Sequence, residues 1–145
     1  MTPDIDALRR FFSLSPFMVE LGVEPTAVSS GRLTTVLVLA DRHLQHTGHV
    51  HAGVTAALAD HSMGAAAQTI TADGHWIMTA ELKTSLLRPA RGERLVCEAR
   101  VLKPGRRIAF TEAEVWCESG AERTLVAKCS ATMAVVAASA PGNGS

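Results

Sequence analysis

The sequence predicts a single α+β domain in which a mostly antiparallel sheet accompanies one long helix. A single stretch of small, helix-favouring residues is flanked on both sides by strand-like segments, and short turns separate the strands. The chain has 145 residues, of which 47% are hydrophobic and 19% charged, so it is long enough to bury its own core. We expect the domain to cover residues 1–137 and the small polar tail 138–145 to be disordered.

The first third of the chain predicts one helix and a hairpin. Residues 3–14 form an amphipathic pattern with the apolar side chains on one face. Thr2 can cap this helix, and a Ser-Pro pair ends it because the residue before a proline disfavours helix. Strands are expected at 21–28 and 32–39, joined by a Ser-Ser-Gly turn.

A polar loop at 40–51 then leads into the long helix, expected at 53–70. Alanine stands at nearly every other position of this helix, which keeps it thin and suits a helix enclosed by other structure. Four more strands are expected at 76–87, 94–102, 106–117 and 123–136, with Pro- or Gly-containing turns between them. Glu112 and Glu114 alternate with less polar residues, which is typical of a half-solvated antiparallel strand.

Composition excludes several classes of function. The 14 basic residues balance the 14 acidic ones without a basic run, so we expect no nucleic-acid partner. No apolar run approaches the ~20 residues that span a bilayer, and the N-terminus lacks the pattern of a signal peptide. Cys97, Cys117 and Cys129 lie in apolar strand-like stretches, which predicts reduced, buried thiols in a cytoplasmic protein rather than a catalytic cysteine.

Asp60 is the most informative residue, because it is a lone carboxylate in an otherwise small and apolar helix. Burying an acid is costly unless the protein uses it. Its neighbours on the same helical face, Ala56, Ala57, Met63 and Gly64, argue against the alternative of a solvent-facing or ion-paired acid. A loop that runs into a helix start also leaves backbone N–H groups ready to bind an anion. Together these features indicate an acyl-transfer site.

The residues from Gln45 to Asp60 read Q-x-x-G-x-x-H-A-G-V-x-x-x-L-A-D. This string resembles the hotdog-fold thioesterases of the phenylacetate-pathway (PaaI-like) type, which carry N/Q-x-x-G-x-x-H-G-G followed by a catalytic Asp seven residues after the second Gly. The downstream stretch MTAELKTSLLRPARGERL resembles the strand and turn of that family, where an early Ser or Thr faces the active site. Ala52 departs from the family's usual Gly, and Gln45 replaces the Asn of some relatives.

The resemblance implies a hotdog fold, with the sheet wrapped around the long helix, and active sites between the subunits of a dimer or of a dimer of dimers. It implies that Asp60 is the general base or nucleophile and that the backbone N–H groups of Ala52 and Gly53 hold the thioester oxygen. By the same resemblance Gln45 contacts the thioester or the attacking water, and Thr79 orients that water. His51 is a further candidate for the catalytic site, and we expect it to brace the loop and the helix start rather than to take part in the chemistry.

The implied reaction is hydrolysis of a small-to-medium, aromatic or aliphatic acyl-CoA, with CoA as part of the substrate and no separate cofactor. Two alternatives stay open: a non-catalytic module that binds acyl thioesters, and a hotdog dehydratase that pairs a His with an acid. His46 and His49 form an H-x-x-H pair without further converging ligands, so we expect no metal site. Six basic residues flank the predicted turns and are candidates for contacts with the CoA phosphates, although the sequence does not distinguish among them. They are Lys83, Arg88, Arg91, Lys103, Arg106 and Arg107.

Overall fold

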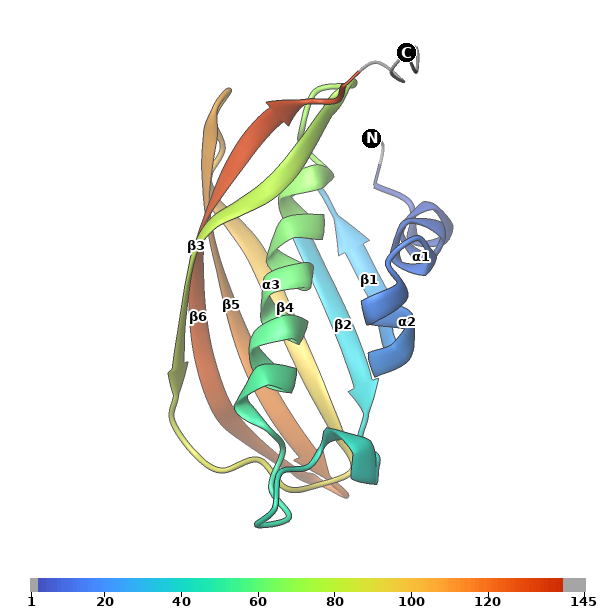
Figure 1. The fold of residues 1–145 in the computed structure, drawn as a ribbon, viewed down its shortest axis with the longest axis vertical. Coiled ribbons are helices and arrows are strands. Elements are labelled where there is room, and N and C mark those ends of the chain that lie inside the picture. The colour runs from blue at the N-terminus through green and yellow to red at the C-terminus, as the bar shows by residue number, and fades with distance from the viewer. Residues whose placement is uncertain (1–2, 140–145) are drawn as a thin grey trace, which may run out of the picture.

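The computed structural model describes residues 3–139 and consists of one curved antiparallel sheet with a long helix against its inner face (Figure 1). The strands are β1 (Val23–Ser29), β2 (Arg32–Val38), β3 (His75–Leu86), β4 (Arg94–Lys103), β5 (Ile108–Ser119) and β6 (Glu122–Ala137). Their order in the sheet is β1-β2-β4-β5-β6-β3, so β1 and β3 are the two edge strands. The helices are α1 (Ile5–Ser13), α2 (Pro16–Leu21), a short 3-10 turn η1 (Asp41–His43) and α3 (Ala52–Gln68). This arrangement confirms the predicted α+β class and hotdog fold.

Helix α3 can lie inside the sheet because its side chains are small. Ala59 and Ala66 are fully buried, as are the larger Leu58 and Met63, and the helix contacts β2 to β6. Alanine both favours helix and lets strands approach closely, so the sheet can curve around the helix. Strand β5 alternates buried residues with more exposed ones, which confirms the predicted alternation around Glu112 and Glu114.

The structure corrects the N-terminal prediction in two respects. The expected single helix is α1, capped by Asp4, whose carboxylate accepts from two backbone N–H groups of the first turn. Thr2, the expected cap, lies outside the described residues. A second helix, α2, follows directly from Pro16, because proline at the first helical position is already set for helix geometry. Elsewhere the expected strands begin or end within a few residues of the observed ones.

A buried polar cluster ties α3 to the sheet. The Ser62 hydroxyl donates to the Leu58 carbonyl at 2.7 Å, and the Thr35 hydroxyl lies 2.7 Å from the Ser62 oxygen. Cys97 is buried beside them, and burial raises the pKa of its thiol to about 12. All three cysteines are buried, as predicted, so their thiols are poorly reactive at neutral pH.

The chain beyond β6 begins with a hydrogen bond back to the turn before β3. The backbone N–H of Ala138 donates to the Gly74 carbonyl at 2.8 Å, which ties the start of the expected tail to the turn before β3. Residues 140–145 lie outside the described residues. Among the helices of residues 3–139, none has the length and apolarity that a bilayer crossing requires.

His61 joins α1 to α3 through aromatic contacts. Its ring stacks on Phe11 with centroids 6.1 Å apart and meets the edge of Phe12 at 4.5 Å. Its Nε2 atom is buried without a hydrogen-bond partner in the described structure. Desolvation lowers the pKa of His61 below 6.5, and the neighbouring Asp60 charge opposes this effect only in part.

The lowered pKa of His61 predicts acid sensitivity of the fold. The unfolded chain binds the proton more readily than the folded one, so stability falls as pH drops below 6.5 and levels off below the folded pKa. We expect His61→Leu to flatten the pH dependence of the urea midpoint between about pH 7 and pH 5. His46→Gln, which alters an exposed loop histidine, is the control and should keep the wild-type slope. Equal slopes in wild type and His61→Leu would contradict this assignment.

Candidate active site

Asp60 lies two turns into α3 and is half-buried at the side that faces β3. The hydroxyl of Thr79 donates to Asp60 Oδ1 at 2.6 Å and also lies 3.5 Å from Met133 Sδ. A short bond from a hydroxyl to a carboxylate is charge-assisted and fixes the carboxylate's orientation. Because the Thr79 hydroxyl donates to Oδ1, the other carboxylate oxygen, Asp60 Oδ2, remains available to a further donor. The structure thus brings together two of the predicted site residues.

Gln45 begins a tight loop that precedes α3. The Gln45 N–H donates to the His49 carbonyl at 2.8 Å, and the Gly48 N–H donates to the Gln45 carbonyl at 3.0 Å. Gly48 has a φ of 84°, which only glycine adopts easily and which closes the turn. The Gln45 Oε1 atom accepts from the Thr47 N–H at 3.1 Å, so its amide NH₂ is left to donate elsewhere.

This loop is anchored at both ends. The Val50 N–H donates to the Ala90 carbonyl at 2.9 Å, which attaches the loop to the connection between β3 and β4. His43 is fully buried: its Nδ1 accepts from the Ala40 N–H at 2.9 Å, so the imidazole donates through Nε2 to the Leu21 carbonyl at 2.8 Å. Sequence reasoning missed His43, because nothing in its spacing distinguishes an anchoring histidine from the others in the loop.

His51 caps α3, as its expected bracing role suggested. Its Nδ1 accepts from the Gly53 N–H at 2.8 Å. The Gly53 N–H is therefore occupied, whereas the Ala52 N–H donates to no acceptor within residues 3–139. Of the two N–H groups that were expected to hold the thioester oxygen, the structure leaves the one from Ala52 available. Ala52 does not have a positive φ, so its departure from glycine introduces no backbone strain.

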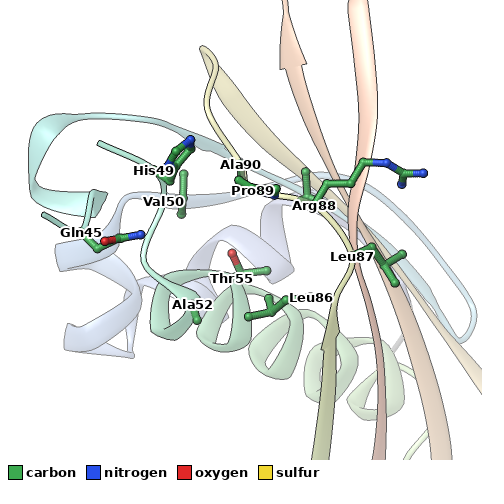
Figure 2. A pocket seen from close by; sticks show the side chains of 11 residues that line it. Gln45, His49, Val50, Ala52, Thr55, Leu86, Leu87, Arg88, Pro89 and Ala90 are labelled. Carbon is green, nitrogen blue, oxygen red and sulfur yellow. The ribbon is translucent and has the colours of Figure 1, made fainter. Parts of the chain in front are cut away.

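A pocket of about 370 Å³ opens beside this helix start (Figure 2). Gln45 and Ala52 line it, together with Thr55 from α3 and Leu86 from the end of β3. Thr55 and Leu86 were not predicted, because only the fold brings the end of β3 against the first turns of α3. Of the six cations proposed for phosphate contacts Arg88 alone lines this pocket, and it donates to the Leu125 carbonyl at 2.8 Å.

Asp60 and Thr79 do not line this pocket. Asp60 follows Ala52 by eight residues on an unbroken helix, which places the two about 12 Å apart along its axis. One carbonyl group therefore cannot contact the Ala52 N–H and the Asp60 carboxylate of the same chain. The predicted residues thus fall into two separate groups in each chain, one near Ala52 at the start of α3 and one around Asp60.

The two histidines of the H-x-x-H pair do not converge on one point of the loop. His49 Nδ1 lies 3.0 Å from the Thr47 hydroxyl, and His46 is exposed. Within residues 3–139 no three His, Cys, Asp or Glu side chains converge as metal ligands would.

Known proteins resemble this chain in both sequence and structure. Residues 47–124 match the family model of the Thioesterase superfamily. A Caenorhabditis elegans protein named as an esterase is 37% identical over 93 residues, which are 63% of this chain and 54% of that protein. The chain thus matches about half the length of this curated relative.

Solved structures agree over most of the fold. A thioesterase family protein from Silicibacter pomeroyi is 28% identical, with a TM-score of 0.87 over 90% of this chain and 96% of that one. A protein from Ralstonia eutropha, named for thioesterase activity and phenylacetic acid degradation, is also 28% identical, with a TM-score of 0.77 over 90% and 98% of the two chains. These similarities support thioester hydrolysis as the class of reaction.

The His51 cap yields a prediction about stability. A methyl group added at Gly53 would lie 3.0 Å from His51 Nδ1 and 3.3 Å from Cε1, so the ring must move and the cap is weakened. We expect Gly53→Ala and His51→Ala each to lower the free energy of unfolding by about 1 kcal/mol, with little added loss in the double variant. Ala52→Gly, at the neighbouring position of the same first turn, is the control for helix propensity. Denaturant unfolding measures all four, and additive losses would show that the two residues do not act through one cap.

Proposed function

The chain belongs to the Thioesterase superfamily, and on that premise we propose that it hydrolyses acyl-CoA thioesters at sites shared between two subunits. The observation that carries the proposal is the separation along α3 of two half-sites, the residues near Ala52 and those around Asp60. Asp60, which Thr79 contacts, stands about 12 Å along α3 from the free Ala52 N–H, whereas a reacting thioester needs both groups within contact distance. A second copy that brings its Ala52 end beside this Asp60 completes the site.

In the proposed reaction the thioester carbonyl oxygen accepts a hydrogen bond from the Ala52 N–H at the start of one α3. That donor faces the charge that develops on the oxygen and lies at the positive end of the helix dipole. The Gln45 amide, whose oxygen is held by Thr47, donates to the thioester or to the attacking water. The acyl group is small to medium, aromatic or aliphatic, in keeping with the PaaI-like resemblance.

Asp60 of the other subunit supplies the base. Its Oδ2 accepts a proton from water while the water oxygen attacks the carbonyl carbon, and Thr79 keeps the carboxylate oriented through Oδ1. The C–S bond then breaks, the acid is released, and the proton is transferred to the CoA thiolate. The nucleophilic route, in which Asp60 attacks the carbonyl first and water hydrolyses the resulting anhydride, uses the same oxygen. CoA enters as substrate, and no separate cofactor is needed.

The dehydratase alternative has weaker support. It requires a histidine that exchanges protons in concert with an acid, but His51 Nδ1 already accepts from the Gly53 N–H and holds the start of α3. An enoyl-CoA hydration assay run beside the hydrolysis assay distinguishes the two reactions.

Release of CoA thiol from a panel of acyl-CoA substrates tests the proposal directly. We expect Asp60→Asn to lower kcat/KM by about 10²–10⁴-fold, because the amide cannot accept the proton. Thr79→Val should lower it by about 10–100-fold through the loss of a charge-assisted hydrogen bond. Glu122→Gln, an isosteric change at an exposed acid far along the chain, should leave it unchanged. A wild-type protein that binds these thioesters without releasing thiol would instead be the non-catalytic module.

A shared site also predicts complementation between inactive chains. Asp60→Asn and Gln45→Ala lie in different half-sites, so a mixed dimer of the two variants contains one doubly altered site and one intact site. With random pairing half of the dimers are mixed, and each has one of its two sites intact. Co-refolding should thus restore about a quarter of wild-type activity.

Two controls frame that experiment. Each variant refolded alone should stay at its own residual activity, and Asp60→Asn mixed with Thr79→Val should gain little, because both changes affect the same half-site. Mixing without any recovery would show that each chain works alone, and the shared site would be rejected.

A further inference from the structure

We propose that the side-chain hydroxyl of Thr55 is a second hydrogen-bond donor to the thioester carbonyl oxygen, beside the Ala52 N–H. The assignment rests on the proposed function, because it adds a group to the same site. It is supported by the backbone hydrogen bonds of the first turn of α3, by the environment of the Thr55 hydroxyl, and by the place of both residues in one pocket.

The first turn of α3 offers one backbone donor where two were expected. The Gly53 N–H donates to His51 Nδ1 at 2.8 Å. The next two N–H groups, those of Val54 and Thr55, both donate to the His51 carbonyl. Of this turn the Ala52 N–H is left for a ligand, whereas a carbonyl oxygen can accept two hydrogen bonds and is stabilised by each donor aimed at it. A second donor from this part of α3 therefore has to be a side chain.

Thr55 is buried, yet the helix does not use its hydroxyl. Its exposed fraction is 3%, and the hydroxyl makes no hydrogen bond within the described part of the chain. The hydroxyls of Ser62, Thr69 and Thr71 instead donate to carbonyls three or four residues earlier, at 2.7 to 2.8 Å. The carbonyl that Thr55 would reach in this way, that of His51, already accepts two backbone N–H groups. Because buried hydroxyls are normally hydrogen-bonded, this one is available to a group that enters the pocket.

The Thr55 hydroxyl lies near the level of Ala52. Residues three apart in a helix share a face, and their Cα atoms are about 4.5 Å apart along the axis. Side chains tilt toward the N-terminus of a helix, which brings the Thr55 hydroxyl back toward the first turn. Both residues line the pocket, and Figure 2 shows the Thr55 oxygen turned toward Val50 and Ala90 of its wall. One oxygen atom in the pocket can therefore accept from the Ala52 N–H and the Thr55 hydroxyl together.

The pocket around the hydroxyl favours an oxygen that becomes negative. Val50, Leu86 and Val126 contribute apolar side chains to its wall, and a hydrogen bond is stronger in such surroundings than in water. Arg88 adds a positive charge to the lining. Among the described residues that line the pocket none is acidic, so no carboxylate competes for the Thr55 donor.

In the proposed reaction the hydroxyl donates a hydrogen bond and keeps its proton. As the water oxygen bonds to the carbonyl carbon, the electron pair of the C=O bond moves to the oxygen, where the two donors stabilise its charge. When that pair returns and the C–S bond breaks, the hydrogen bond weakens again. Thr55 thus contributes more to the transition state than to substrate binding, and its loss should appear in kcat rather than in KM.

Steady-state hydrolysis by Thr55→Val tests this assignment, because valine keeps the shape of threonine and removes the hydroxyl. We expect kcat to fall by about 10²-fold and KM to rise by less than about fivefold. Thr55→Ser, which keeps the hydroxyl, should recover most of the lost rate. Thr71→Val is the matched control and should keep the wild-type kcat, since the Thr71 hydroxyl bonds to the Ala67 carbonyl. A higher KM with an unchanged kcat would place the hydroxyl on another part of the substrate and overturn the proposal.

The urea midpoint separates a role in chemistry from a role in folding. The Thr55 hydroxyl makes no hydrogen bond within the described chain, so Thr55→Val should keep or raise the midpoint. Thr71→Val loses a hydrogen bond and should lower it. A Thr55→Val protein in which both the midpoint and kcat fall would assign the lost activity to packing, and the proposed contact would be rejected.

Binding of two CoA analogues distinguishes failure of this inference from failure of the proposed function. In the ketone analogue of butyryl-CoA a methylene group replaces the sulfur and the carbonyl oxygen is kept, whereas S-butyl-CoA has no carbonyl. In titration calorimetry Thr55→Val should bind the ketone about threefold more weakly than wild type does and should bind the thioether equally well.

The combined results leave no outcome undecided. If wild type hydrolyses thioesters and Thr55→Val keeps full kcat, the Thr55 contact is overturned and the proposed function stands. If wild type hydrolyses none but Thr55→Val selectively weakens binding of the ketone, the contact is supported and the function is rejected. Equal binding of the ketone by both proteins, together with an unchanged kcat, overturns the contact alone.

Discussion

The fixed length of α3 is the constraint on which the rest of this structure depends. A helix rises about 1.5 Å per residue, and the Asp60 carboxylate and the Ala52 N–H occupy places on the same unbroken helix. Neither group can approach the other by a side-chain rotation or a loop movement. The sheet that encloses α3 adds to this rigidity, because its curvature depends on the small side chains that fill the space between them. Chemistry that needs both groups must therefore be assembled from two chains.

The loop before α3 shows how the fold prepares the other half of such a site. Buried His43 connects the end of α2 to the loop through the Leu21 carbonyl, and its own carbonyl accepts from the His51 N–H at 2.9 Å. His51 in turn accepts from the Gly53 N–H, so a continuous series of hydrogen bonds runs from α2 to the first turn of α3. Donors that are held in place before the substrate arrives need no reorganisation during the reaction, which is what makes them effective.

The parts of this fold that the sequence predicted are those with local signals. The alanine-rich run predicted the bounds of α3 to within two residues, and the alternation of apolar and polar residues predicted the strands. Both patterns repeat over two to four residues, so they can be read from neighbouring positions in the chain. Helix α2 was missed because six residues are too few to show a helical period. The contact between Thr79 and Asp60 spans 19 residues and came only from the family resemblance, since threonine is ordinary in a strand. The occupied Gly53 N–H and the Gln68 contact with β3 depend on side-chain geometry, which no spacing reveals.

Strand β3 connects assembly to chemistry, because one strand contributes both the Thr79 hydroxyl and an unpaired edge. An exposed edge is a general liability for a monomeric protein, since it can pair with any extended segment. Here the Gln68 amide covers the part of the edge that lies before Thr79, and the bulge at residue 80 interrupts the regular ladder just beyond it. What remains open is short, bounded at both ends and flanked by charges of both signs. An edge that is short and bounded at both ends offers few unpaired groups to a chance extended segment. One strand therefore both orients the Asp60 carboxylate through Thr79 and limits non-specific pairing along its own open edge.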